Sequence, residues 1–156
     1  MTYVPKHHGK PLKEPKSAYG HVWRFQMLSK RIDGAAAPRS RIMYRLQRSV
    51  NLMKAERLGA ARFQDVCSRL AISNEVIELH RRIAANAWIL KGMAGYLPDN
   101  EEALSIATDI DSNGLARLPF GDRNINPRMS LDDLRDIVRR SKNGWVVRDK
   151  GGTMDS

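Results

Sequence analysis

Three arginines, Arg41, Arg45 and Arg48, recur at spacings of three and four residues between Ser40 and Gly59. This spacing places all three guanidinium groups on one face of a helix. A guanidinium group holds its donors in a rigid fork that matches the oxygens of a phosphate. Few acidic residues lie nearby in the sequence to neutralise these arginines. The pattern therefore favours an external anion, and a solvated helix face is the alternative.

The other side of the same predicted helix carries an apolar stripe, which predicts the side that packs against the rest of the protein. At 100° per residue the apolar side chains fall within one arc, so one side of the helix should pack while the other presents arginines. Leu52 falls on the arginine side and interrupts the pattern. The stripe consists of Ile42, Met43, Leu46, Val50 and Met53.

Positive charge is concentrated in the first 62 residues, which hold 14 Lys and Arg against three Asp and Glu, whereas the rest of the chain holds 13 against 14. This asymmetry indicates a polyanionic partner, nucleic acid first and an anionic membrane surface second. Prolines and glycines in residues 1–20 exclude a helix there. We expect a flexible basic arm that follows phosphates, with a solvated tail as the alternative. Its lysines are Lys6, Lys10, Lys13 and Lys16.

Residues 21–32 predict a short helix that ends at Asp33 and Gly34. Within it, Arg24 lies between Trp23 and Phe25, and basic residues interleaved with aromatic ones can bind unpaired bases. We favour the other interpretation, in which the two aromatic side chains anchor the arm on the core.

Residues 63–83 have the features that a helix-turn-helix requires. Two short helices must cross at a tight angle, which needs a small residue in the first helix and another in the turn. Cys67 and Ala71 supply these residues. Ser73 or Asn74 would cap the second helix. Apolar packing positions are filled by Val66, Leu70, Ile72 and Ile77.

The stretch from Leu70 to His80 resembles the turn and recognition helix of LuxR-type regulators, which often have a histidine at the position of His80. Residues 58–83 also resemble, more faintly, the FlhC-like activators, whose cysteine cluster for zinc is missing here because Cys67 is the only cysteine. The resemblance implies DNA recognition by the second helix. A plain helical hairpin, or one long helix from Asn74 to Ala94, is the alternative. The residues that would contact DNA are Ser73, Asn74, Glu75, Glu78, Arg81 and Arg82.

Two further helices are predicted after Leu97. The first begins at Glu101 behind a cap at Asp99 or Asn100, and the second begins at Ser130. Between them, residues 109–114 match the first half of an EF-hand loop, with Asp109, Asp111 and Asn113 as candidate calcium ligands. The twelfth position is a phenylalanine instead of the bidentate glutamate. We therefore favour an Asx-rich turn over a metal site.

Several function classes are excluded or disfavoured. A single cysteine rules out an internal disulfide, and no apolar run approaches the ~18 residues that span a bilayer. The sequence contains no P-loop, nucleophile elbow or glycine fingerprint, so we expect neither an enzyme nor a cofactor. A cytoplasmic location is expected, and an oligomer is compatible with the sequence.

Together these patterns predict an all-α protein, a small helical domain with a helix-turn-helix-like core and a flexible basic N-terminal arm. The predicted divisions are an arm with a short helix (1–38), a helical domain (39–144) and a tail (145–156). The predicted function is binding of double-stranded DNA, as a transcriptional regulator of a phage or mobile element. The alternative is a structural or assembly protein of a phage particle or nucleoprotein complex, which binds nucleic acid or an acidic protein partner through its arm.

Overall fold

The chain is all-α, as predicted: the computed structural model describes residues 15–109 and 125–142, and these contain seven α-helices, one 3-10 helix and no strand. No described helix is both long and apolar enough to cross a membrane. The elements are α1 (Ala18–Gly34), α2 (Pro38–Lys54), the 3-10 helix η1 (Ala55–Leu58), α3 (Ala60–Arg69), α4 (Asn74–Ala85), α5 (Ala87–Gly92), α6 (Glu101–Ala107) and α7 (Leu131–Lys142).

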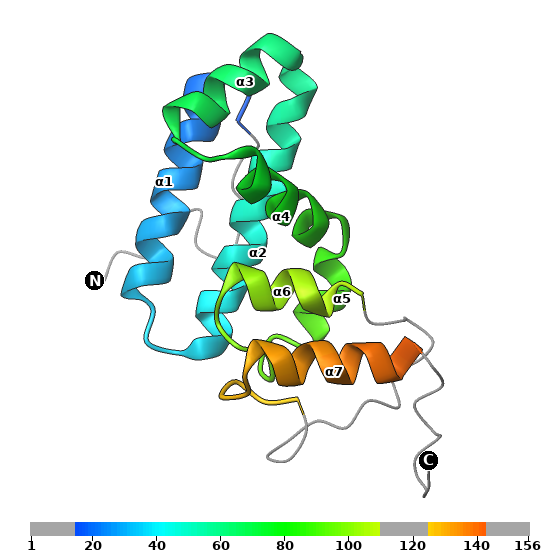
Figure 1. Cartoon of the computed structure of the whole chain (residues 1–156). Helices are drawn as coiled ribbons and strands as arrows, with labels where there is room; N and C mark the ends of the chain where they lie inside the picture. The colour runs from blue at the N-terminus through cyan, green and yellow to red at the C-terminus, as the bar shows by residue number, and fades with distance from the viewer. Residues whose placement is uncertain (1–14, 110–124, 143–156) are drawn as a thin grey trace, which may run out of the picture.

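Helices α1 and α2 form an antiparallel pair that the other helices cover (Figure 1). The α1 helix is longer than the predicted 21–32 because the Ser17 hydroxyl accepts a hydrogen bond from the Gly20 amide at 3.0 Å and starts the helix earlier. Pro38 begins α2 at a position where its missing amide hydrogen has no helical partner. At the far end, η1 extends α2 until Gly59, whose φ of 102° favours glycine.

One of two core clusters joins α1, the end of α2, α3 and α4. The four predicted packing positions of the helix-turn-helix all lie in or against it: Val66 and Ile77 are buried, and Leu70 and Ile72 are half-buried. Leu52 is fully buried here, which explains why an apolar side chain lies on the arginine side of α2. The buried members are Val22, Phe25, Leu52, Ala55, Phe63, Val66, Cys67 and Ile77.

The turn between α3 and α4 has the predicted local structure. Ala71 takes a left-handed φ of 55°, and the Ser73 hydroxyl caps α4 by accepting a hydrogen bond from the Val76 amide at 3.3 Å. The alternative of one long helix from residue 74 to 94 is wrong, because α4 ends at Ala85 and the chain turns at Asn86 before α5 begins.

The larger core cluster lies where α2, α4, α5, α6 and α7 meet, and Figure 1 shows α6 and α7 stacked at this end of the molecule. The predicted caps are present: the Asn100 side chain accepts from the Ala103 amide at 2.8 Å, and Ser130 accepts from the Asp133 amide at 3.0 Å. The α2 helix contributes Ile42 and Leu46 to this cluster and Leu52 to the other. The α2 helix is therefore the central helix of the fold. Its remaining faces carry the basic residues that are candidates for a functional site.

Candidate functional site

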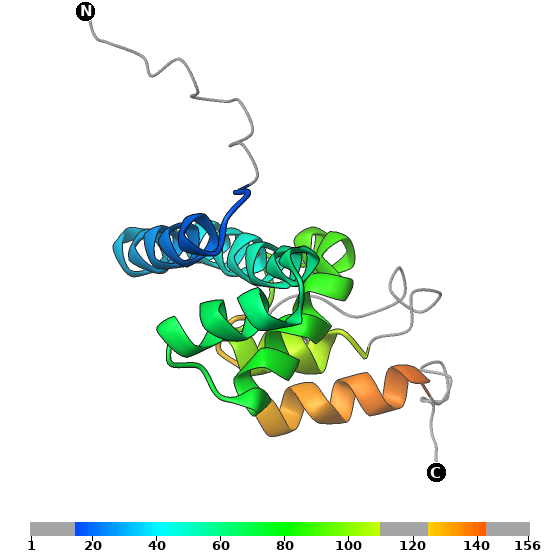
Figure 2. The same ribbon diagram turned by 90° about the horizontal axis from the view of Figure 1, so that it is seen from above.

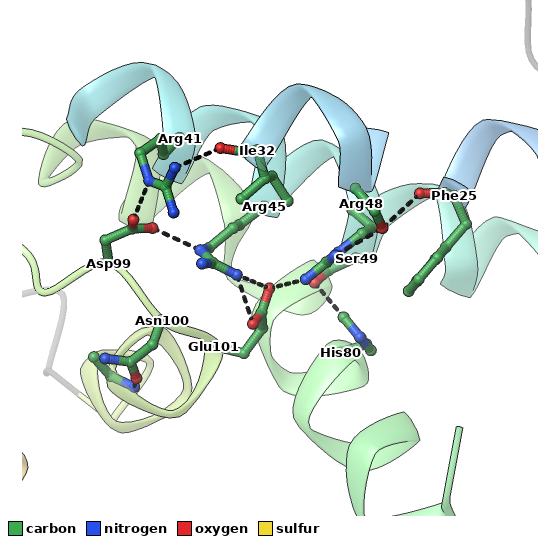
Figure 3. Close-up of polar contacts among 12 residues, drawn as sticks. Phe25, Ile32, Arg41, Arg45, Arg48, Ser49, His80, Asp99, Asn100 and Glu101 are labelled. Carbon is green, nitrogen blue, oxygen red and sulfur yellow. Dashed lines mark hydrogen bonds and ion pairs between the residues drawn. The ribbon is translucent and has the colours of Figure 1, made fainter. Parts of the chain in front are cut away.

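The three arginines of α2 do not face an external anion, which corrects the expectation from their spacing. They lie against Asp99 and Glu101, at the start of α6, and Figure 3 shows the alternating chain of polar contacts that results. Arg45 donates to Asp99 at 2.6 Å and to both oxygens of Glu101 at 2.8 Å. Arg41 pairs with Asp99, and Arg48 pairs with Glu101. We call these five residues the arginine–carboxylate network.

Two arginines of the network also form hydrogen bonds with α1 and so hold α1 against α2. Arg41 donates to the Ile32 carbonyl at 2.6 Å, and Arg48 donates to the Ser29 hydroxyl at 2.8 Å. Arg48 also lies over the Phe25 ring, 5.1 Å from its centroid. The charged side chains of the network are only 13–28% exposed. These half-buried side chains therefore join α1, α2 and the start of α6, and the network acts as a structural clamp.

The electrostatics of the network agree with this role. Burial alone would raise the pKa of Glu101 and Asp99, but the arginine charges and hydrogen bonds outweigh it, and both pKa values are lowered. Next to the network, Ser49 Oγ lies 2.7 Å from His80 Nδ1. Burial, and then the positive charge of Arg48, lower the pKa of His80 to about 4. His80 is thus a buried neutral packing residue.

The arginines predicted to contact DNA from α4 are also paired within the protein. Arg81 donates to both oxygens of Glu56 at 2.8 Å and to Glu78 at 3.2 Å. Arg82 donates to Asp109 at 3.0 Å and to the carbonyl of Ser105 at 3.1 Å.

The exposed start of α4 is acidic. Asn74, Glu75 and Glu78 are exposed there, and the Ser73 hydroxyl is used as the cap. The candidate recognition surface consequently offers carboxylates, which repel phosphate, where a duplex would approach.

The calcium hypothesis gains nothing from the structure. Asp109, the one candidate ligand that is described, pairs with Arg82, and Asp111 and Asn113 lie outside the described residues. Across residues 15–109 and 125–142, no group of three or more acidic, histidine or cysteine side chains could hold a metal ion.

A second face of α2 forms the floor of an open groove of about 580 Å³, which we call the α1–α5 groove. Figure 2 shows α2 between α1 and α5, which supply the two walls. Four basic side chains and two aromatic ones line the groove, and no Asp or Glu is among its described lining residues. The basic residues are Arg24 and Arg31 on α1, Lys54 on α2 and Lys91 on α5, and the aromatic residues are Tyr44 and Trp88.

Like charges lie close together in this groove. Burial, and then the positive charge of Arg31, lower the pKa of Arg24. The guanidinium carbon of Arg31 lies 5.8 Å from the centroid of the Tyr44 ring, a cation–π geometry that leaves its charge uncancelled. On the other wall, Trp88 is 73% exposed. The groove thus combines positive potential with accessible aromatic surface, which suits an anion that carries flat rings.

The sequence-predicted site residues are not brought together. Arg24 is the one that lines the groove, and exposed Lys16 follows Pro15, another lining residue. Lys6, Lys10 and Lys13 lie outside the described residues. The prediction for the aromatic pair is right for Phe25, which is buried, and wrong for Trp23, which is 53% exposed on α1.

Sequence reasoning missed most of the groove, namely Arg31, Tyr44, Lys54, Trp88 and Lys91. One signal was present for Trp88: the apolar residues that recur at helical spacing in this part of the sequence do not include this tryptophan. They are Val76, Ile83, Ala87, Leu90 and Ala94. A tryptophan outside the packing stripe of a helix is expected to be exposed.

No family model, curated protein or solved structure matches the chain.

Proposed function

We propose that the protein binds nucleic acid and that the α1–α5 groove contacts its phosphates. The observation that supports this most strongly is the set of four basic side chains in the groove, without a carboxylate among the described lining residues. Five other arginines of α2 and α4 form ion pairs within the protein, namely Arg41, Arg45, Arg48, Arg81 and Arg82. The groove thus gathers four basic side chains from three helices around one hollow, which suits a polyanionic partner.

The N-terminal lysines strengthen this proposal. The chain reaches the described structure at Pro15, which itself lines the groove, so the basic segment that holds Lys6, Lys10 and Lys13 is covalently joined to the groove's edge. These lysines would add their positive charge to the attraction of a polyanion. Neutralisation of phosphates by both parts would give an affinity that depends steeply on salt.

This arrangement favours contact with the nucleic-acid backbone over reading of base sequence by α4. Among the two functions expected from the sequence, the assembly protein of a nucleoprotein complex therefore fits the geometry better. Such a protein needs affinity for phosphates without strong preference for one sequence.

The salt dependence of binding tests the proposal. We expect the logarithm of the binding constant to fall linearly with the logarithm of the salt concentration, as measured by fluorescence anisotropy of a labelled oligonucleotide. The double variant Lys54→Gln, Lys91→Gln should reduce the slope by roughly 1.4 to 1.8, since each phosphate contact contributes about 0.7 on a single strand or 0.9 on a duplex.

The matched control is Arg62→Gln, Arg128→Gln, which removes the same charge from exposed positions outside the groove lining. Its slope should stay close to that of the unchanged protein. An affinity that does not respond to salt, or an equal effect of both double variants, would contradict the proposed contact.

The second candidate function is a sequence-specific regulator that reads duplex DNA with α4. It is favoured by one observation, the turn with a left-handed Ala71 and the Ser73 cap between two short helices. A regulator should prefer one duplex over random DNA by a factor on the order of 10³ or more. Selection of bound sequences from a random duplex pool separates the two functions, because an assembly protein would enrich no common sequence.

A further inference from the structure

We propose that the α1–α5 groove is a binding site for single-stranded nucleic acid, in which a base stacks on Trp88 while the basic walls contact the flanking phosphates. This inference rests on the proposed function and names the form of nucleic acid that the groove accepts.

Trp88 provides the aromatic surface of the proposed site. A tryptophan side chain is usually buried, yet this one is 73% exposed on the wall of a groove. Its position is fixed by the helix around it: Leu90 is fully buried in the larger core cluster, and Asn86, the residue before α5, accepts backbone hydrogen bonds at 3.1 Å from the amides of Ile89 and Leu90. The indole is therefore held outward on a short, anchored helix, as a stacking surface requires.

The charges around Trp88 match a chain of phosphates. Lys91 lies three residues after Trp88 on the same helix, a spacing that places both side chains on one face. Arg24 and Arg31 are separated by two helical turns on the opposite wall, so their Cα atoms are roughly 10 Å apart along α1. Cations on both sides of an aromatic ring suit a strand whose bases point inward and whose backbone follows the walls.

The floor of the groove adds a polar group that could meet the edge of a base. Gln47 lies on the floor with an exposed side chain, and its amide can both donate and accept. Asn51, the other amide there, is occupied because it donates to the His21 carbonyl at 3.2 Å and lies 3.1 Å from the His21 ring nitrogen.

The concave shape of the site favours an unpaired strand over a duplex. Proteins read a double helix with elements that protrude into its grooves. A hollow of about 580 Å³ has the size of a site for a small organic ligand, which can enclose a base and its sugar. In a duplex the flat faces of the bases are stacked on one another and cannot meet Trp88.

Titration of three probes tests this inference: a thymidine oligomer about 12 nucleotides long, a duplex of the same length, and thymidine monophosphate. The oligomer should bind more tightly than the duplex. Trp88→Ala should weaken oligomer binding by roughly 5- to 150-fold, and Trp88→Phe should restore part of the loss. The control Trp23→Ala removes another exposed tryptophan, one that does not line the groove, and should have no effect.

A spectroscopic readout separates stacking from a general loss of affinity. In the Trp23→Phe, Trp145→Phe background Trp88 is the only tryptophan, so quenching of its fluorescence by the oligomer would report a base on the indole. Thymidine monophosphate should quench the same signal at higher concentration, since it supplies one base and one phosphate.

The outcomes are distinguishable. Equal binding of oligomer and duplex, with Trp88→Ala unchanged, would overturn the single-strand site and leave the proposed function intact. Salt-independent or absent binding of both nucleic acids would remove the proposed function as well. Quenching by an acidic peptide that matches the oligomer's effect would instead assign the groove to an acidic protein partner and overturn the inference.

Discussion

Two faces of α2 carry basic side chains in different surroundings. On one face, Arg41, Arg45 and Arg48 are enclosed by two carboxylates and hold α1, α2 and α6 together. On the other, Tyr44 and Lys54 line a groove with Arg31 and Lys91, and its described lining residues include no Asp or Glu. Helical spacing can thus place arginines on one face of a helix, but their role depends on which residues pack against that face.

The largest expected effect is the loss of Glu101. Glu101→Gln leaves Arg45 and Arg48 half-buried without their shared charge partner, so we expect the free energy of unfolding to fall by about 3 kcal/mol. Urea denaturation followed by circular dichroism measures it. The neighbouring variant Glu102→Gln is the control, because its exposed pair with Arg135 should contribute less than about 1 kcal/mol. Equal effects of the two variants would contradict the structural role of the network.

The second largest effect should be a loss of stability in acid, caused by His80 and the arginine–carboxylate network. The pKa of His80 is about 4 in the folded protein and about 6.5 when unfolded, so the unfolded state binds the proton first as the pH falls. Stability should therefore decrease between about pH 6.5 and pH 4, by up to about 3 kcal/mol. Below about pH 4, the stability contributed by the lowered pKa values of Asp99 and Glu101 should be lost as well.

Urea denaturation at about pH 7 and pH 4.5 measures this change. His80→Gln should be less stable at neutral pH but should lose much less stability between these two values. A pH dependence that is unchanged in the variant would show that another group is responsible.

The smallest effect on stability should come from the groove. Lys91→Gln removes one positive charge from an exposed position and should change the free energy of unfolding by less than about 0.5 kcal/mol. Arg45→Gln removes the same charge from the network and should destabilise the protein by about 2 kcal/mol or more. For nucleic-acid affinity we expect the opposite: Lys91→Gln should weaken binding more than Arg45→Gln does, when both variants are folded and are compared at low temperature. If Lys91→Gln were the more destabilising change, the two faces would not differ as described.

Local features of the fold could be predicted from the sequence because they depend on nearby residues. The caps at Ser73, Asn100 and Ser130 follow from hydrogen bonds to amides three residues later. The packing positions of residues 63–83 likewise follow from helical periodicity. These features define where helices begin and which side of each is apolar.

The candidate site could not be predicted in the same way. The carboxylates that neutralise Arg41, Arg45 and Arg48 lie more than 50 residues downstream, and they meet the arginines because the chain just before α6 and its first residue lie beside α2. The groove likewise joins α1 and α2 with α5, which α3 and α4 separate from them in the chain. Its residues have ordinary spacing within each helix, so their common location depends on tertiary packing.

The position of α2 in both core clusters has a consequence for how the protein unfolds. Leu46 belongs to the cluster beneath α6 and α7, and Leu52 belongs to the cluster beneath α3. Disruption of either cluster exposes part of the same helix and removes support from the other. The two ends of the molecule should therefore lose their structure in a single cooperative transition, with the amides of α2 among the last to exchange with solvent.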